Sequence, residues 1–358
     1  MSLFFKGADI SMLEEMERHG ARYYLHGQQK DPFAILAECG VNLIRLRLWN
    51  DPNSEAGESY GGGGNDLDVT KRLARRAAEH DMAWMLDFHY SDFWVDPAKQ
   101  FKPKAWASLH GEQLQEAVYR YTKQTLLELR QESLLPAMVQ VGNEITNGFL
   151  WPDGHYDDPD GMIGLLKAGI QAVREVDASI KIVEHLDFGT DNGLYRKWFS
   201  VAQEYGLDYD VIGMTYYPFW NGSIEALVHN MNDVSAAFGK DVLIAETSMG
   251  YTTDPLGCNG MIYSEELEKN TPYPGTKAGQ EAFMRDLIQA VRNVNGGRGI
   301  GVIYWEPAWL PFPECAWAKP VGCEYMHDKA ELGNSWANQA LFDAKGNANP
   351  ALTNLKPM

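Results

Sequence analysis

The chain has no long apolar run and few cysteines. No stretch approaches 18 consecutive apolar residues, so we expect no segment that spans a membrane. Four cysteines in 358 residues are too few for a disulfide framework. Cys39 is expected to be a buried apolar residue, while Cys258, Cys315 and Cys323 fall in late loops and leave one bridge open, such as Cys315–Cys323. A zinc site formed with His327 is disfavoured, because no close pair of cysteines is present.

Positive charge is also scarce. The 31 Lys and Arg residues stand against 49 Asp and Glu residues, which gives a formal net charge of −18. A field of this sign repels nucleic acids and anionic membranes, so neither is an expected partner. It suits a soluble protein with a neutral ligand, and we expect a monomer.

Targeting and linker signals are absent from the sequence as well. No charged segment followed by an apolar one, as in a signal peptide, precedes the first predicted strand. A secreted or periplasmic chain that has lost its signal and a cytoplasmic chain are both left open. No linker, low-complexity tract or charge run interrupts the sequence, so we expect one domain over residues 1–358.

Eight short apolar runs alternate with amphipathic stretches along the chain. The runs, which we interpret as strands, cover residues 4–9, 42–49, 83–89, 137–144, 180–185, 210–217, 241–247 and 299–307. Intervening stretches such as 66–81 and 111–131 have helical periodicity. Strands that alternate with helices predict parallel βαβ units, and eight such units close into a (β/α)8 TIM barrel.

An open, doubly wound sheet is the alternative architecture. It usually carries a GxGxxG turn after its first strand, whereas the corresponding segment here is KGADIS. The glycine run GGGGND at 61–66 lies in a long loop after the second predicted strand. We interpret it as a loop that is flexible or closely packed, and not as a phosphate-binding loop.

Polar and aromatic residues stand where the predicted strands end. They are Asp9, Arg45, Arg47, Asp87, His89, Asn143, Glu144, Tyr216, Tyr217, Glu246, Trp305 and Glu306. Each alone has a structural explanation, such as an interior Arg–Asp pair, a core histidine or a helix cap. Because the carboxyl ends of barrel strands converge on one mouth, the joint pattern predicts a catalytic site there.

Two glutamates on different strands provide what retaining glycoside hydrolysis requires. Glu144 and Glu246 would act as proton donor and nucleophile, with carboxyl groups about 5–5.5 Å apart. Arg45 or Arg47 near Glu246 is expected to lower the pKa of that carboxyl, while a more apolar setting keeps the proton on Glu144. Asn143 supplies a donor for a sugar hydroxyl.

Eight stretches spread over nearly the whole chain carry a more specific signal. They are KGADIS, GVNLIRLRLWNDP, YGGGGNDLDVTKRLARRA, LDFHYSDFWVDPAKQ, VQVGNEITNGFLWP, IGMTYYPFW, VLIAETS and SWANQALFD. In this order they resemble glycoside hydrolase family 53, the endo-β-1,4-galactanases. The resemblance implies Glu144 as the acid/base and Glu246 as the nucleophile.

The resemblance and the strand-end pattern together indicate the residues that would line the sugar site. The predicted substrate-binding residues are Asp9, Arg45, Arg47, His89, Trp94, Asn143, Tyr216, Tyr217, Trp220, Trp305, Trp309, Trp336 and Asn338. Either Tyr216 or Tyr217 should donate a hydrogen bond to the nucleophile. The tryptophans are candidate platforms for the C–H face of a sugar, with core packing as the alternative for each.

No cofactor is expected to be required. Some bacterial relatives bind calcium between the loops after the seventh and eighth strands, but residues 249–275 lack their Asp/His/Asn-rich pattern. Calcium is therefore left open and not predicted. The expected substrate is neutral galactan, the side chain of pectin, and its galactooligosaccharides, with product length and number of subsites left open.

Other functions remain to be distinguished from this one. The same mechanism could act on another β-1,4-polymer, mannan or cellulose, and a barrel could bind an oligosaccharide without cutting it. The second alternative predicts the loss of a catalytic carboxylate, and both are present. A barrel aldolase would need a Schiff-base lysine at a strand end, and no predicted strand ends in lysine.

Overall fold

A computed structural model describes residues 4–356, and its centre is a closed barrel of eight parallel strands. The strands are β1 (Phe5–Asp9), β4 (Leu43–Leu48), β5 (Ala83–Phe88), β6 (Met138–Val141), β9 (Lys181–Leu186), β10 (Val211–Thr215), β11 (Asp241–Thr247) and β12 (Gly299–Trp305). Neighbours pair in chain order, and β1 closes the ring by pairing with both β4 and β12. The predicted (β/α)8 barrel is confirmed.

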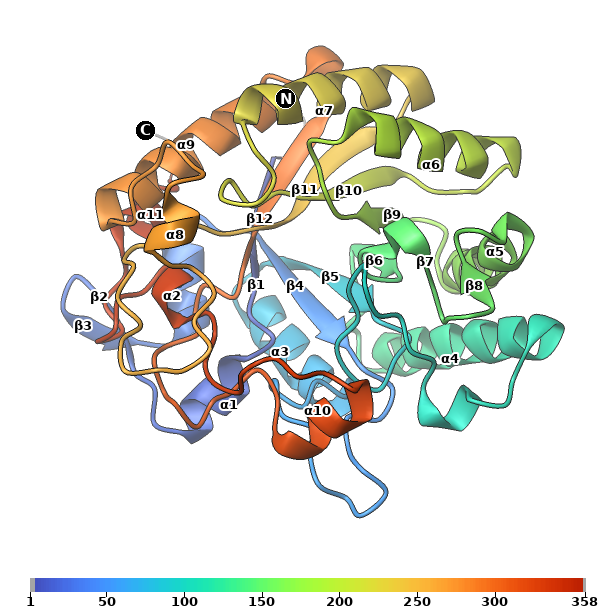
Figure 1. The fold of residues 1–358 in the computed structure, drawn as a ribbon, viewed down its shortest axis with the longest axis horizontal. Coiled ribbons are helices and arrows are strands. Elements are labelled where there is room, and N and C mark those ends of the chain that lie inside the picture. The colour runs from blue at the N-terminus through green and yellow to red at the C-terminus, as the bar shows by residue number, and fades with distance from the viewer. Residues whose placement is uncertain (1–3, 357–358) are drawn as a thin grey trace.

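Helices follow the strands and surround the barrel, as Figure 1 shows. The larger ones are α2 (Pro32–Glu38), α3 (Leu67–Glu79), α4 (Gly111–Gln131), α5 (Pro159–Val176), α6 (Asn192–Glu204), α7 (Ile224–Phe238) and α9 (Lys277–Arg292). Shorter helices are α1 (Leu13–Arg18), α8 (Glu265–Glu268), α10 (Pro320–Met326) and α11 (Pro350–Thr353). Two hairpins, β2 (Tyr23–Leu25) with β3 (Gln28–Lys30) and β7 (Gly148–Phe149) with β8 (Gly154–His155), lie outside the barrel.

Short polar side chains begin several of the outer helices. Asp31 accepts a hydrogen bond from the Phe33 amide at 2.8 Å, and Pro32 occupies the first turn of α2, where its missing N–H costs nothing. Asp66 caps α3 in the same way, through the Val69 amide at 2.8 Å. These caps satisfy amides that the helix itself leaves unpaired, so each loop can turn directly into a helix.

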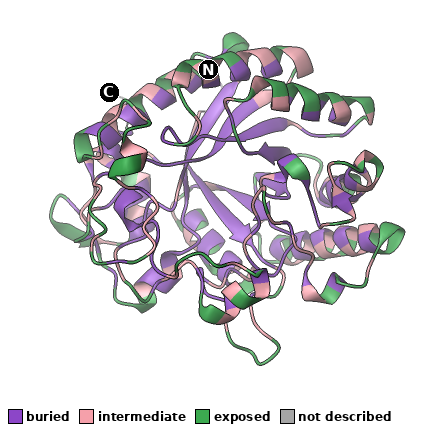
Figure 2. Ribbon diagram, viewed as in Figure 1, coloured by how far each residue is buried: buried purple, intermediate pink, exposed green. Residues whose placement is uncertain are grey.

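Apolar residues fill two layers of the fold. One layer lies between the strands and the helices, and Figure 2 shows buried residues on the strands and the inner helix faces, with exposed residues on the outer faces. A second, separate cluster fills the barrel interior near the amino ends of the strands. It consists of Leu43, Met85, Met138, Val183, Val211, Leu243, Ile300 and Ile303. The polar mouth is therefore at the other end of the barrel.

Three predicted strands end two or three residues earlier than the sequence suggested. β6 ends at Val141, and the chain then turns through Gly142 (φ 89°) and Glu144 (φ 48°). A side chain at position 142 would come 2.6 Å from Ile145 Cγ2, so this turn requires glycine. β10 likewise ends before Tyr216, and β12 ends before Glu306. Glu144, Tyr217 and Glu306 thus lie on turns that leave the barrel, whereas Arg45 and Glu246 lie on the strands β4 and β11 themselves.

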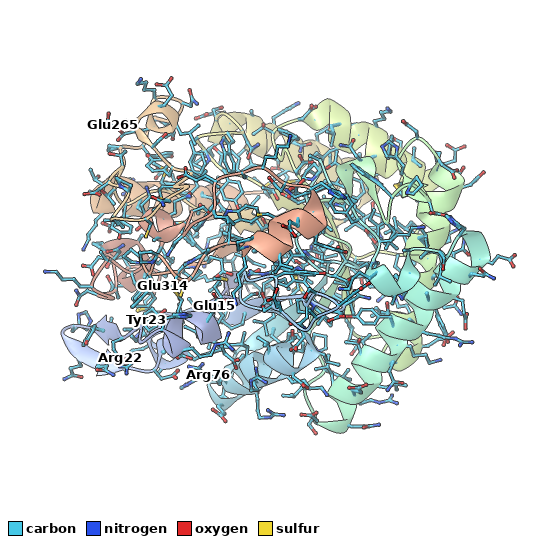
Figure 3. All side chains as sticks on the ribbon, turned by 60° about the horizontal axis from the view of Figure 1, so that its bottom comes forward. Glu15, Arg22, Tyr23, Arg76, Glu265 and Glu314 are labelled. Atoms are coloured by element: carbon cyan, nitrogen blue, oxygen red, sulfur yellow. The ribbon has the colours of Figure 1, made fainter. Side chains whose placement is uncertain are left out.

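The glycine run in the long loop after β4 is closely packed. Gly61 to Gly64 all have positive φ, and a side chain on Gly62 would come 2.8 Å from the Trp317 carbonyl oxygen. The Gly63 amide donates to Glu15 Oε2 at 2.7 Å, and Glu15 is marked on α1 in Figure 3. The backbone here holds the loop after β12 against α1, which favours the closely packed interpretation over the flexible one.

Candidate active site

The carboxyl ends of the strands open into a cavity of about 380 Å³. Its lining includes the predicted residues Glu144, Glu246, Arg45, Arg47, His89, Asn143, Tyr217, Trp94, Trp220, Trp305, Trp309 and Trp336. Side chains from six of the eight strand ends thus meet in one space, as the barrel topology requires.

Three predicted residues do not line this cavity. Asp9 is fully buried below it, where Oδ2 accepts from Arg45 Nη1 at 3.0 Å. The Tyr216 hydroxyl donates to the Gly222 carbonyl at 2.8 Å, and the Asn338 amide donates to the Tyr263 carbonyl at 2.8 Å. These side chains support the strands and loops around the site, and the prediction that they contact a sugar does not agree with their position.

Glu246 is held by one arginine and one tyrosine. Arg45 Nη1 lies 2.7 Å from Glu246 Oε1, and the Tyr217 hydroxyl donates to Glu246 Oε2 at 3.3 Å. Neighbouring residues on an extended chain point in opposite directions, so only one of Tyr216 and Tyr217 can face the cavity. Arg47 pairs with Glu306 instead. The two alternatives left open by the sequence are therefore resolved as Arg45 and Tyr217.

The pKa of Glu246 differs from the expectation. Burial raises the pKa of this carboxyl to about 7, against the opposing charge of Arg45. The predicted lowering by arginine is present, but the loss of hydration outweighs it, because Arg45 is shared with two other carboxylates, Asp9 and Asp87. The arginine therefore limits the rise and does not reverse it.

Glu144 holds its proton more strongly than Glu246 does. Burial raises the pKa of Glu144 well above its ordinary value, and the negative charge of Glu246 raises it further. Of the two, Glu246 is the one with a direct arginine partner among residues 4–356. The first proton to leave the pair therefore comes from Glu246, which leaves one carboxylate and one carboxylic acid facing the same cavity.

A layer of polar side chains lies directly beneath the two glutamates. Arg45 Nη2 donates to Asp87 Oδ2 at 2.8 Å, to Gln140 Oε1 at 3.1 Å and to Asn143 Oδ1 at 3.0 Å. Burial disfavours the charge of Asp87, yet Arg45 and His89 outweigh it and lower the pKa of Asp87. This network fixes the guanidinium, and through it the position of Glu246.

Sequence reasoning missed two residues next to Glu144. Thr215 Oγ1 lies 2.7 Å from Glu144 Oε1, and His185 Nε2 lies 2.9 Å from the same threonine oxygen. Both lie near the ends of predicted strands, His185 in 180–185 and Thr215 in 210–217, so their positions in the sequence could have marked them as site residues. Their residue types could not, because a threonine or histidine at a strand end is more often structural.

Aromatic rings form the walls of the cavity. Trp305 and Trp336 meet edge to face with ring centroids 4.5 Å apart, and Trp220 is 48% exposed at the rim. The Arg47 guanidinium lies 4.3 Å from the centre of the Trp94 ring, which holds that ring from below. The rings present apolar surface next to the carboxyl groups, as sugar stacking requires.

Part of the cavity wall comes from residues that the sequence did not indicate. Trp317, in the loop after β12, lines the cavity and accepts at its carbonyl from Trp94 Nε1 at 2.8 Å. Lys99, in the loop after β5, lies 2.7 Å from Asp328 and 3.0 Å from Asp96. The Trp94–Trp317 and Lys99–Asp328 contacts join two loops that are more than 200 residues apart in the chain, so no local pattern could have revealed them.

The remaining sequence expectations concern metals, cysteines and membranes. Among residues 4–356, no group of three or more His, Cys, Asp or Glu side chains is arranged to hold a metal ion. All four cysteines are free thiols, and the Cys315–Cys323 bridge is not formed. No helix in the described part of the chain is long and apolar enough to cross a membrane.

A (β/α)8 barrel whose mouth holds two glutamates in unequal surroundings, walled by aromatic rings, has the features of a glycoside hydrolase. Residues 5–355 match the model of glycosyl hydrolase family 53. The chain belongs to this family.

Individual proteins of the family resemble the chain over nearly its full length. An endo-beta-1,4-galactanase of Bacillus subtilis (strain 168) is 38% identical over 98% of this chain and 84% of its own length. The solved Ignisphaera aggregans GH53 catalytic domain superimposes with a TM-score of 0.93 at 39% identity, covering 99% of this chain and 95% of that one. A solved fungal beta-1,4-galactanase covers all of both chains, with a TM-score of 0.80 and 27% identity.

Proposed function

We propose that this glycoside hydrolase cleaves internal β-1,4-galactosidic bonds of galactan with retention of configuration. The observation that carries the proposal is the unequal pair of glutamates at the barrel mouth, with Glu246 held by Arg45 and Tyr217, and Glu144 in contact with Thr215. Family membership and the galactanase names of several relatives favour galactan over mannan and cellulose. The presence of both carboxyls argues against a barrel that only binds oligosaccharide.

The first chemical step divides the work between the two carboxyl groups. Glu246 attacks the anomeric carbon and forms a covalent glycosyl-enzyme, while Glu144 gives its proton to the departing glycosidic oxygen. Tyr217 and Arg45 hold the two oxygens of Glu246, so the attacking carboxylate is oriented before the substrate arrives.

The second step reverses the role of Glu144. As a carboxylate it takes a proton from water, and the resulting nucleophile releases the sugar from Glu246. This sequence requires carboxyl groups about 5–5.5 Å apart, and a separation of 6.5–9.5 Å would instead mean inversion. The anomeric configuration of the first product, followed by NMR, tests the assignment directly.

A comparison of polysaccharides tests the substrate. Purified protein should release reducing sugar from galactan faster than from mannan or carboxymethylcellulose. Because the proposed action is internal, the viscosity of galactan should fall early, and short galactooligosaccharides should accumulate. Faster cleavage of mannan would overturn the substrate assignment while leaving the mechanism intact, and binding of galactan without any cleavage would overturn both.

A further inference from the structure

A line of three buried polar side chains runs away from the acid/base glutamate. Glu144 Oε1 is 2.7 Å from Thr215 Oγ1, Thr215 Oγ1 is 2.9 Å from His185 Nε2, and His185 Nδ1 is 3.1 Å from Asn143 Oδ1. His185 is fully buried. Each contact is short enough for a hydrogen bond, so the protons along this line must be distributed consistently.

The amide of Asn143 determines one end of the line. Its Nδ2 donates to the Val95 carbonyl at 3.1 Å, and its Oδ1 accepts from Arg45 Nη2 at 3.0 Å. A carbonyl cannot donate and a guanidinium cannot accept, so the oxygen and nitrogen of this amide cannot be exchanged. The atom that faces His185 is therefore an acceptor, and His185 Nδ1 must carry a proton.

His185 is neutral in its surroundings. Its two ring nitrogens contact only the neutral groups of Asn143 and Thr215. Burial lowers the pKa of His185 well below its ordinary value, and the charge of Arg45 lowers it further. A neutral imidazole has one N–H, and it is on Nδ1, so Nε2 is an acceptor.

The hydroxyl proton of Thr215 is then donated to His185. The hydroxyl has a single hydrogen, which His185 Nε2 accepts, and the threonine oxygen turns its lone pairs toward Glu144. The 2.7 Å contact with Glu144 Oε1 is then a hydrogen bond only when Glu144 is protonated and donates. An ionised Glu144 would place two acceptors face to face.

We propose that His185 and Thr215 are positioning residues that hold the proton on Glu144 in the resting enzyme. The inference rests on the proposed function of Glu144 and adds the origin of its proton. When Glu144 protonates the leaving oxygen, the Thr215 hydroxyl turns from His185 to the new carboxylate. His185 Nε2 then has no hydrogen-bond donor. The hydrogen bond from Thr215 to Nε2 forms again when Glu144 takes a proton from water in the second step.

Other charged groups also act on these side chains. Glu144 is faced by Glu246 of β11, by Asp187 after β9 and by Asp96 after β5. His185 is faced by Arg45 of β4 and by Asp87 and His89 at the end of β5. The three carboxylates around Glu144 also favour its protonated form, so a high pKa alone does not test the proposal. The proposal is tested by the direction in which the pKa of Glu144 changes when the Thr215 hydroxyl is removed.

The tautomer of His185 is the first test, and it requires no substrate. With ¹⁵N-labelled histidine, the signal lost in His185→Gln assigns the ring in the intact protein. We expect a proton on Nδ1 and none on Nε2 near neutral pH. A proton on Nε2, alone or in an imidazolium, would overturn the proposal. Failure to cleave galactan would overturn the proposed function and leave this result unaffected.

The alkaline limb of kcat/KM is the second test. Thr215→Val removes the acceptor of the Glu144 proton and so lowers the pKa of Glu144. The alkaline limb should therefore shift to a lower pH, by about 0.5 to 1 pH unit. Thr215→Ser should restore the wild-type profile. If Thr215 instead donates to an ionised Glu144, the limb in Thr215→Val moves up, which contradicts the proposal, as does an unchanged limb.

Two further variants separate a proton-holding role from a structural one. His185→Leu frees the Thr215 hydroxyl to donate to the carboxylate, so the limb should again move down, whereas the amide of His185→Gln can replace both ring nitrogens and should retain the profile. Thr122→Val removes a buried hydroxyl on α4 that contacts Tyr90 and should leave the profile unchanged. A limb that moves equally in all variants would overturn the assignment.

Discussion

The two ends of the barrel interior differ although the same strands build both. Near the amino end, Leu43, Met85, Met138 and Val183 belong to an apolar cluster. Two residues further along the same four strands stand Arg45, Asp87, Gln140 and His185, all buried and polar. Residues i and i+2 of a strand point to the same side, so both sets face the barrel axis. The layer near the amino end therefore stabilises the fold, and the next layer toward the mouth serves the chemistry.

This contrast predicts that the two layers fail in different ways. Burying a charged network costs hydration free energy, and burying apolar side chains is favourable. A change at the mouth should therefore reduce activity and leave the fold in place. A change in the apolar layer should reduce the free energy of unfolding and leave the catalysis of the folded fraction intact.

The largest effect is expected for Glu246→Ala. Without the nucleophile, galactan cleavage should fall by on the order of 10⁴-fold or more, while circular dichroism and the unfolding transition remain near those of the wild type. Azide should enter the vacated space, attack from the side of the missing carboxyl and give a product of inverted configuration. Measurable galactan turnover near the wild-type rate would contradict the assignment.

Glu144→Ala should differ in its dependence on the leaving group. Loss of the general acid should slow galactan cleavage by about 10²–10⁴-fold, but a galactoside with an activated leaving group should lose far less rate. Azide should intercept the glycosyl-enzyme and give a product of retained configuration. If the two glutamate variants exchange these azide products, their roles are exchanged as well.

Leu43→Ala tests the apolar layer. Leu43 is fully buried near the amino end, and its truncation leaves a cavity that should lower the free energy of unfolding by about 2–5 kcal/mol. Denaturant unfolding measures this loss, and kcat of the folded protein should stay unchanged. A fall in kcat without a loss of stability would show that the two layers are not independent.

The smallest effect is expected at Glu184, a polar residue outside both layers. It is fully buried on β9, next to the inward-facing His185 and so on the opposite side of the strand. Within the described residues 4–356, neither of its carboxyl oxygens has a hydrogen-bond partner. Burial raises the pKa of Glu184 well above its ordinary value. The folded protein therefore favours the protonated form, and its contribution to stability is full below the unfolded pKa and is lost as pH rises toward the folded one.

Glu184→Leu should remove this pH dependence and raise the free energy of unfolding by about 1–3 kcal/mol at neutral pH. Glu184→Gln, which cannot ionise but keeps an unpaired polar group, should remove the pH dependence with a smaller gain. Urea unfolding between pH 5 and pH 9 measures both variants. An equal pH dependence in all three proteins would mean that Glu184 is paired in solution.

The sequence determined the fold and the two reactive residues. Eight apolar runs alternating with amphipathic stretches allow few topologies, and the polar residues at their ends mark the mouth. Glu144 and Glu246 could be selected because carboxyl groups following separate strands must converge in a closed barrel. Strand ends were less well determined, since the chain leaves the sheet at Val141, well before Glu144.

The tertiary structure alone decided which neighbour acts on which group. The sequence could not distinguish Arg45 from Arg47, because both point inward and differ only in depth. It placed Asp9 at the sugar, whereas the folded barrel buries it beneath Arg45. The sequence led us to predict a lowered pKa for Glu246, which is wrong. The loss of hydration that raises this pKa depends on atoms from every strand, and a local pattern does not contain them. Local pattern fixes the direction of a side chain, but depth, hydration and long-range partners arise only when the barrel closes.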